Sequence, residues 1–237
     1  MGKQPVIILH GWGLSSGKFQ LLAQLFDRKK YKVFVPDLPG FGKSVMPTKA
    51  LALKDYADFL YVFVNNNHID KPILIGHSFG GRVALKYQLL YPRATKMLVL
   101  TGTPGFTPVP RRRLIFFITI AKIGKFISSA PPFSFFEDRV RSWYYYVVGA
   151  RDFYRAKGVM RETFKIIVQE DLMPCLRKVM VPCVLAWGAN DRITPLWIAK
   201  KMKEIIPQAN IVVIPDADHG VSYKQPEIFF NAIRKFL

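Results

Sequence analysis

The sequence has little cysteine. Its 237 residues include only Cys175 and Cys183, which are too few to form a disulfide framework. We expect two ordinary reduced thiols, with Cys183 buried because it lies in an apolar run. Scarce, unpaired cysteine is typical of a reducing compartment, and a cytoplasmic location is therefore expected.

Acidic residues are also scarce, with 16 Asp and Glu against 35 Lys and Arg and a formal net charge of +19. A chain this basic could bind nucleic acid, anionic lipid or an acidic carrier protein. Residues 105–173 hold 12 basic and 6 acidic side chains, so about a third of the charge lies on about a third of the chain. The charge is spread, and no zinc-finger or aromatic RNA-binding motif accompanies it, so we expect no nucleic-acid partner.

Long hydrophobic runs are missing. The longest, over residues 114–121, falls far short of the roughly 20 residues of a membrane span, so no integral membrane segment is expected. The opening "MGKQPVIILHGWG" does not resemble a signal peptide, because its apolar run is short and leads directly into a motif. Valine at position 6 argues against a myristoylation signal.

Short apolar runs are plentiful, and six of them have β-type composition: residues 5–9, 32–36, 72–76, 96–100, 183–187 and 210–214. Each is apolar on both faces, which is typical of strands buried between helical layers. Stretches with helical periodicity alternate with them over 17–29, 53–67, 81–92, 195–207 and 225–237. The alternation predicts an α/β fold with right-handed crossovers. Pro195 is expected in the first turn of its helix, with Thr194 as the N-cap.

One connection contains no predicted strand. It begins with the turn-rich "GTPGFTPVPRRR" and continues with aromatic helical patterns over 113–129, 133–149 and 160–173. We interpret residues 105–172 as a helical cap (lid) inserted into a core formed by residues 1–104 and 173–237.

The stretch "GHSFG", residues 76–80, lies between a predicted strand and a predicted helix. It matches the G-x-S-x-G pattern of a nucleophile elbow, in which a strained turn lifts the serine oxygen above the sheet. Side chains at the flanking glycine positions would clash in such a turn. Ser78 is therefore predicted to be a nucleophile.

A serine hydroxyl needs a base, and a base and an acid follow the last two predicted strands. His219 lies in "PDADHG" and Asp191 in "GANDRITP". Ligands of open α/β sheets bind beyond the carboxyl ends of the strands, where these residues are expected to meet Ser78. We predict that His219 is the general base and acid and that Asp191 orients it.

Other histidines and aspartates compete for these roles: His10, His68, His77, Asp216 and Asp218. His77 should point away from the serine if the turn is tight, and His10 should have a structural hydrogen-bonding role. His68 has no companion residue. The two aspartates are expected to hold their own loop.

Acyl transfer also needs donors for the developing oxyanion. The backbone N–H of Phe79, which follows the nucleophile, is one predicted donor. The loop after the first strand supplies the other, and Gly11 there points to the N–H of Trp12. A packing role for Trp12 is the alternative.

With "HGWG", "DLPGFGKS", "GHSFGG", "WGANDRITP" and "DADHG" in this order, the chain resembles the α/β-hydrolase family over nearly its whole length. Within the family the pattern resembles that of small capped serine esterases and their relatives, including the biotin-pathway pimeloyl-carrier methyl ester carboxylesterase. The resemblance implies a Ser78–His219–Asp191 catalytic triad, an oxyanion hole at Trp12 and Phe79, and a cap at residues 105–172. No cofactor and no metal are expected.

The chain departs from the family at its start. The family normally has two further strands before the first one predicted here, and only four residues precede that strand. We therefore predict six strands, all parallel, with the strand at 32–36 on an exposed edge where a homodimer could form.

The leading functional hypothesis is a serine carboxylesterase acting on apolar acyl groups. Serine at position 78 argues against haloalkane dehalogenases and epoxide hydrolases, which use aspartate there. Carbon–carbon bond hydrolases, cofactor-free perhydrolases and hydrolases of acyl-carrier or CoA thioesters or esters remain alternatives. Arg111, Arg112 and Arg113 could grip an acidic acyl carrier protein. A small-molecule receptor and association with a membrane surface are further alternatives.

Overall fold

The computed structural model describes residues 2–106 and 156–237. Within them a single sheet has the strand order β2-β1-β3-β4-β5-β6, and every neighbouring pair is parallel. The six strands are β1 (Gln4–Leu9), β2 (Tyr31–Phe34), β3 (Ile73–His77), β4 (Met97–Thr101), β5 (Cys183–Gly188) and β6 (Asn210–Ile214). Each predicted run overlaps one of them, so the predicted six-stranded parallel sheet is confirmed.

The sheet separates two hydrophobic cores. Alternate residues of a strand face opposite sides, so Val6 and Ile8 enter one core while Ile7 and Leu9 enter the other. All four side chains are fully buried. Helices on both faces thus explain why the strands are apolar at consecutive positions.

One face packs against η1 (Ser16–Phe19), α1 (Gln20–Gln24), α10 (Val221–Lys224) and α11 (Pro226–Ile233), followed by η3 (Arg234–Phe236). The other packs against α2 (Leu53–Asn66), α3 (Phe79–Leu90), α8 (Met173–Arg177) and α9 (Leu196–Ile205). The predicted helix over 17–29 is wrong in its length. Helix α1 ends at Gln24, and the carbonyl of Asp27 accepts the N–H groups of Lys30 and Tyr31, which turns the chain into β2.

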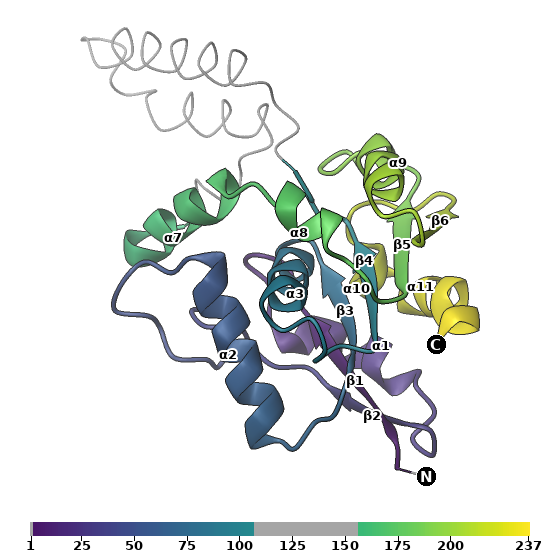
Figure 1. The fold of residues 1–237 in the computed structure, drawn as a ribbon, viewed down its shortest axis with the longest axis horizontal. Helices are drawn as coiled ribbons and strands as arrows, with labels where there is room; N and C mark the ends of the chain where they lie inside the picture. The colour runs from purple at the N-terminus through teal and green to yellow at the C-terminus, as the bar shows by residue number, and fades with distance from the viewer. Residues whose placement is uncertain (1, 107–155) are drawn as a thin grey trace, which may run out of the picture.

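Helix α7 (Gly158–Gln169) lies inside the segment expected to form the cap. In Figure 1 it lies above α2, and α8 follows it above α3. The other two predicted cap helices and Arg111–Arg113 lie outside the described residues. The boundaries of the cap stay a prediction.

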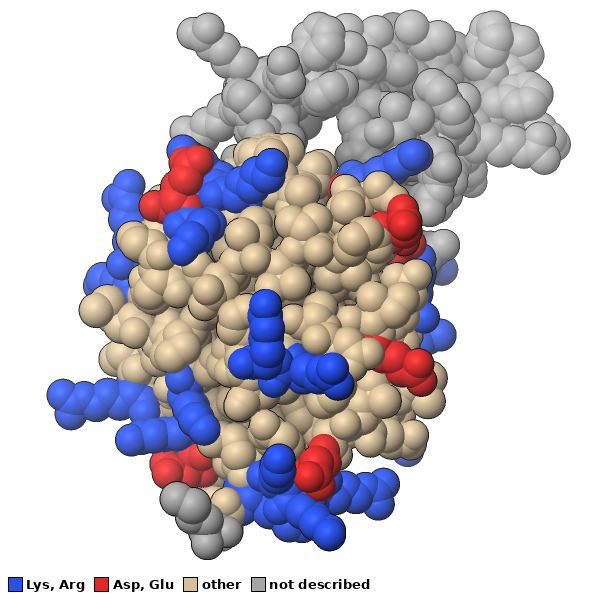
Figure 2. Space-filling view, turned by 90° about the vertical axis from the view of Figure 1, so that its right-hand side faces the viewer, with Lys and Arg blue, Asp and Glu red and all other residues tan. Residues whose placement is uncertain are grey.

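The edges and the surface agree with the sequence pattern. Strand β2 is an edge of the sheet, as predicted, and it carries the exposed Lys32, a charge of the kind that discourages edge-to-edge pairing. Figure 2 shows one face on which Lys and Arg are scattered among uncharged residues. In the described part of the chain, no helix combines the length and the hydropathy of a membrane span. Cys175 and Cys183 are both buried and unpaired.

Candidate active site

Ser78 occupies a strained turn between β3 and α3. Its φ of 51° and ψ of −110° lie in a region that costs a residue with a side chain about 1–3 kcal/mol. Three backbone hydrogen bonds hold the turn: the Ser78 N–H donates to the Thr101 carbonyl at 2.9 Å, and the Ser78 carbonyl accepts the N–H groups of Gly81 and Arg82. The serine is thereby fixed at the carboxyl edge of the sheet.

The glycines around Ser78 leave no room for side chains. A Cβ on Gly76 would lie 2.5 Å from the Cα of Gly81. A Cβ on Gly80 would overlap the carbonyl of Leu9 and lie 2.7 Å from the carbonyl oxygen of His10. The predicted steric reason for the G-x-S-x-G spacing is therefore confirmed.

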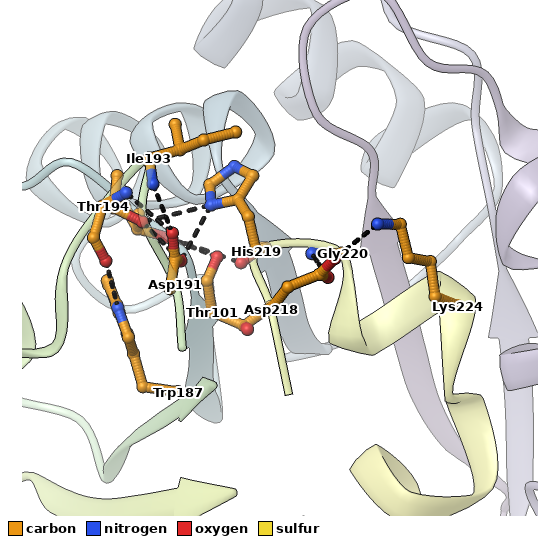
Figure 3. Close-up of polar contacts among 11 residues, drawn as sticks. Thr101, Trp187, Asp191, Ile193, Thr194, Asp218, His219, Gly220 and Lys224 are labelled. Atoms are coloured by element: carbon orange, nitrogen blue, oxygen red, sulfur yellow. Dashed lines mark hydrogen bonds and ion pairs between the residues drawn. The ribbon is translucent and has the colours of Figure 1, made fainter. Parts of the chain in front are cut away.

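Asp191 and His219 meet beyond the ends of β5 and β6 (Figure 3). His219 Nδ1 lies 2.8 Å from Asp191 Oδ2. Because a carboxylate only accepts, Nδ1 is the donor in this contact, and in a neutral ring the lone pair is then on Nε2. The Asp191 side chain is 1% exposed and that of His219 is 14% exposed, so the acid is buried and the imidazole remains accessible.

Three further donors fix the Asp191 carboxylate. Its Oδ1 accepts the N–H groups of Ile193 at 2.9 Å and Thr194 at 2.8 Å. Its Oδ2 accepts the Thr194 hydroxyl at 2.8 Å. Beneath them, the indole of Trp187 donates to the Thr194 carbonyl at 2.6 Å. The loop after β5 is thus locked in the conformation that presents Asp191 to His219.

The predicted helix-capping role of Thr194 is wrong. Helix α9 begins at Leu196 with Pro195 as its N-cap residue, and no side chain caps it. The Thr194 hydroxyl binds the carboxylate of Asp191 because the chain between Asp191 and Thr194 folds back on itself.

Ser78 and His219 both adjoin the end of β4. Gly102, with a φ of 56°, follows Thr101, the acceptor of the Ser78 N–H. A Cβ on Gly102 would lie 2.7 Å from Cε1 of His219. The imidazole therefore lies against Gly102. A residue with a side chain at this position would be strained by the positive φ and would clash with the ring.

The competing histidines have other surroundings. Burial, together with the charges of His219 and His10, lowers the pKa of His77 well below its usual value. Its ring packs near Phe19 and Tyr223, with its centroid 4.9 Å from that of His219.

His10 has the structural hydrogen-bonding role that was predicted. Its Nδ1 donates to the Gly11 carbonyl at 2.8 Å, and its Nε2 accepts the N–H of Leu38 at 3.0 Å. Burial lowers the pKa of His10, which agrees with a neutral ring in this arrangement. His68 is exposed.

Of the competing aspartates, Asp218 holds its own loop. Its carboxylate accepts the N–H of Gly220 at 2.7 Å and pairs with Lys224, whose hydrogen bond lowers the pKa of Asp218 despite partial desolvation. Figure 3 shows Asp218 directed away from His219 toward Lys224. Asp216 is exposed. Neither takes the place of Asp191 beside the imidazole.

The side chains of Trp12 and Phe79, the two residues predicted to supply the oxyanion donors, pack against each other. The rings of Trp12 and Phe79 are 5.3 Å apart, and Trp12 also packs against Phe41 and Phe164, each at 4.9 Å. Neither the Trp12 N–H nor the Phe79 N–H donates to an acceptor within residues 2–106 and 156–237. Both donors are therefore available to a ligand in this part of the structure, and their role stays a prediction.

Sequence reasoning missed Asp37, which shapes the loop after β2. Its carboxylate accepts the N–H groups of Ser16 at 2.6 Å and Lys43 at 2.9 Å. Although desolvation opposes it, these hydrogen bonds lower the pKa of Asp37. The signal was an aspartate at a strand end followed by glycines, of which Gly42 packs against the carboxylate.

The fold and the site define a parallel α/β protein with a strained serine turn and an aspartate–histidine pair at the carboxyl edge of its sheet. The model of the Alpha/beta hydrolase family matches residues 6–232. The chain belongs to that family.

Three relatives illustrate its range. Lipase 3 of Moraxella sp. (strain TA144) is 26% identical, over 91% of this chain and 71% of its own length. The 2-hydroxy-6-oxo-6-(2'-aminophenyl)hexa-2,4-dienoic acid hydrolase of Metapseudomonas resinovorans is 27% identical, over 99% and 84%. The solved structure of a thermophilic esterase from Thermogutta terrifontis (malate bound) has a TM-score of 0.73 and 26% identity, over 100% and 90%. Together with the family, these similarities support a hydrolase activity.

Proposed function

We propose that the protein hydrolyses carboxylic esters through an acyl-enzyme, with Ser78 as nucleophile, His219 as general base and acid, and Asp191 as the group that orients His219. The observation that carries the proposal is the buried Asp191 carboxylate 2.8 Å from His219 Nδ1, beside the strained turn of Ser78. A histidine whose Nδ1 is held by a buried carboxylate can take the proton of a serine hydroxyl at its Nε2, and this is the role we propose for His219 toward Ser78.

The proposed reaction has two balanced halves. Ser78 Oγ attacks the carbonyl carbon while its proton passes to His219 Nε2, and the alcohol leaves with that proton. Water then attacks the acyl-enzyme, giving its proton to His219, which returns it to Ser78 Oγ as the acid departs. Asp191 stabilises the imidazolium that forms in each half.

The N–H groups of Trp12 and Phe79 would bind the oxyanion of both tetrahedral intermediates. Donors of this kind each contribute about 2.7–4 kcal/mol to transition-state stabilisation. The lack of a described acceptor for either N–H supports this role. Their rings, with those of Phe41 and Phe164, form an aromatic group that favours an apolar acyl chain over a charged one.

Carbon–carbon bond hydrolysis is the second candidate. The observation that favours it is the Metapseudomonas relative, whose name describes a dienoic acid hydrolase and which aligns with 99% of this chain. The same serine, histidine and aspartate would serve that reaction. A dienoic acid substrate assayed beside the esters separates the two candidates by their kcat/KM values.

The test is a series of p-nitrophenyl esters from acetate to decanoate, with Ser78→Ala as the control. The wild type should hydrolyse these esters, with kcat/KM rising as the acyl chain lengthens. Ser78→Ala should lower kcat/KM at least about 10⁴-fold, since loss of the nucleophile leaves only binding and the oxyanion donors. Equal activity of wild type and Ser78→Ala would contradict the proposal.

A further inference from the structure

Arg82, one turn beyond Ser78 on α3, is a buried cation with an unusual set of partners. The residue as a whole is only 5% exposed. Nη1 donates to the carbonyl of Pro104 at 2.8 Å, and Nη2 donates to the carbonyls of Ile167 at 2.7 Å and Glu170 at 2.6 Å. Burial lowers the pKa of Arg82 to about 10, so the guanidinium remains charged at neutral pH.

These acceptors lie where the segment between β4 and β5 leaves the core and where it returns. Pro104 is three residues beyond the end of β4. Ile167 belongs to the last turn of α7, and Glu170 is the C-cap residue of that helix. Carbonyls in the last turn of a helix have few partners within it and carry its negative dipole end. A cation there adds to the single N–H, that of Glu170, which the Ile167 carbonyl already accepts.

A second basic residue strengthens the same contact. Lys86 lies four positions after Arg82 and therefore on the same face of α3. Its ammonium group is 2.8 Å from Oε1 of Glu170, and both side chains are mostly buried. Helix α3, which begins directly after Ser78 and is called the nucleophile helix below, thus contacts the end of α7 through two cations.

Two other residues of α7, Thr163 and Phe164, contact the core, and Phe164 does so at Trp12 of the candidate site. The ring of Phe164 lies 4.9 Å from that of Trp12. The hydroxyl of Thr163 accepts the N–H of Leu51 at 3.1 Å. A shift of α7 would therefore move the Phe164 ring that packs on Trp12. It would also disturb the contact between Thr163 and Leu51.

We propose that Arg82 is a positioning residue that locks α7 to the nucleophile helix and, through Phe164, holds Trp12 in place. Its consequence for catalysis rests on the proposed function, because the Trp12 N–H is the proposed oxyanion donor. Arg82 does not itself touch the substrate, since both terminal nitrogens already donate to carbonyl oxygens.

Arg82→Ala, Arg82→Lys and the matched control Arg177→Met, which changes an exposed arginine of α8, test this proposal. Hydrogen exchange should be at least about tenfold faster in residues 158–170 of Arg82→Ala, while β3 and β5 keep their protection. Lysine, which can still donate to some of these carbonyls, should give an intermediate rate. Arg177→Met should exchange like the wild type.

The catalytic arm uses the same variants with p-nitrophenyl butyrate. Arg82→Ala should lower kcat about tenfold with a smaller change in KM, because a displaced oxyanion donor affects the transition state more than the bound ester. Millimolar guanidinium should restore kcat in Arg82→Ala and leave Arg177→Met unchanged, an effect that general destabilisation does not produce.

Unchanged exchange of residues 158–170 in Arg82→Ala, or equally faster exchange throughout the core, would overturn the anchoring role. Faster exchange of α7 with an unchanged kcat would overturn the link to Trp12. If the wild type hydrolyses no ester, the proposed function fails, while the exchange measurements still decide whether Arg82 anchors α7.

Discussion

The turn that carries Ser78 depends on backbone contacts and on glycines that leave no room for a Cβ, whereas the side chains of Asp191 and His219 are oriented in addition by hydrogen bonds to a carboxylate. At Ser78, carbonyl oxygens and Cα atoms lie so close that only glycine fits at positions 76 and 80. At Asp191, the geometry depends on donors to one carboxylate, including the Thr194 hydroxyl. The two regions meet at Gly102, where the imidazole of His219 rests on the backbone.

The difference has a consequence for mutation. Where backbone packs against backbone, an added Cβ must displace a strand or a helix, so one substitution affects the stability of the whole fold. A hydrogen-bonded loop can lose one donor and keep its structure. Substitutions of the glycines at the serine turn should therefore lower stability, and substitutions of the acid and the base should lower activity.

Among the variants that test this comparison, Asp191→Asn should give the largest loss of activity with the fold intact. The amide retains the shape of the carboxylate but favours the wrong tautomer of His219, which lowers kcat about 10⁴-fold in an established triad. Hydrolysis of p-nitrophenyl butyrate and thermal unfolding would be measured together. Asp218→Asn, the matched control, should lower kcat no more than about fivefold, because it breaks only an exposed pair. Similar losses for both variants would contradict the assignment of Asp191.

Gly80→Ala should test the other region through stability. The new Cβ would overlap the Leu9 carbonyl, and backbone cannot rotate away as a side chain can, so we expect a loss of about 3 kcal/mol in the free energy of unfolding. Urea unfolding measures it. Gly17→Ala is the control, because its nearest neighbour is Oγ of Ser15 at 3.8 Å, and it should cost less than about 1 kcal/mol. Equal stability of the two variants would refute the packing argument.

The same contrast explains what the sequence could predict. The glycines around Ser78 made the turn predictable, and the short apolar runs made the six strands predictable. Thr194 and Arg82 were not, because each has an ordinary local explanation, a helix cap for the threonine and a solvated charge for the arginine. Their actual roles depend on tertiary partners, which for Arg82 include Glu170, 88 positions away along the chain. Asp191 was predictable only because it ends a strand.

His77 belongs to the serine turn but touches His219, so it reports on both regions through pH. Well above its ordinary pKa of 6.5 the ring is neutral in both the folded and the unfolded state, so its titration does not affect stability there. Below that pKa the unfolded chain binds a proton that the buried ring, with its lowered pKa, does not. Between pH 7.5 and 5.5 this should reduce the free energy of unfolding by about 1.4 kcal/mol.

Urea unfolding at the two pH values measures that contribution. His77→Phe should reduce the difference between pH 7.5 and 5.5 by about 1.4 kcal/mol relative to the wild type. His68→Gln changes an exposed position. It should leave the pH dependence of the free energy of unfolding unchanged, because the side chain is in water in both the folded and the unfolded state. A pH dependence unaffected by His77→Phe would mean that the ring is protonated within the fold.

Thr194→Val should give the smallest effect and the sharpest test of the side-chain-held loop. Valine keeps the shape of threonine and the backbone N–H that binds Oδ1 of Asp191, and it removes only the hydroxyl that shares Oδ2 with His219. One lost hydrogen bond to a carboxylate should lower kcat about fivefold, or about 1 kcal/mol, with KM unchanged. Thr95→Val is the matched control, because the buried Thr95 hydroxyl has no partner among the described residues and its removal should leave kcat unchanged. If Thr194→Val retains full kcat, the remaining donors suffice to orient Asp191, and the loop depends on its backbone as the serine turn does.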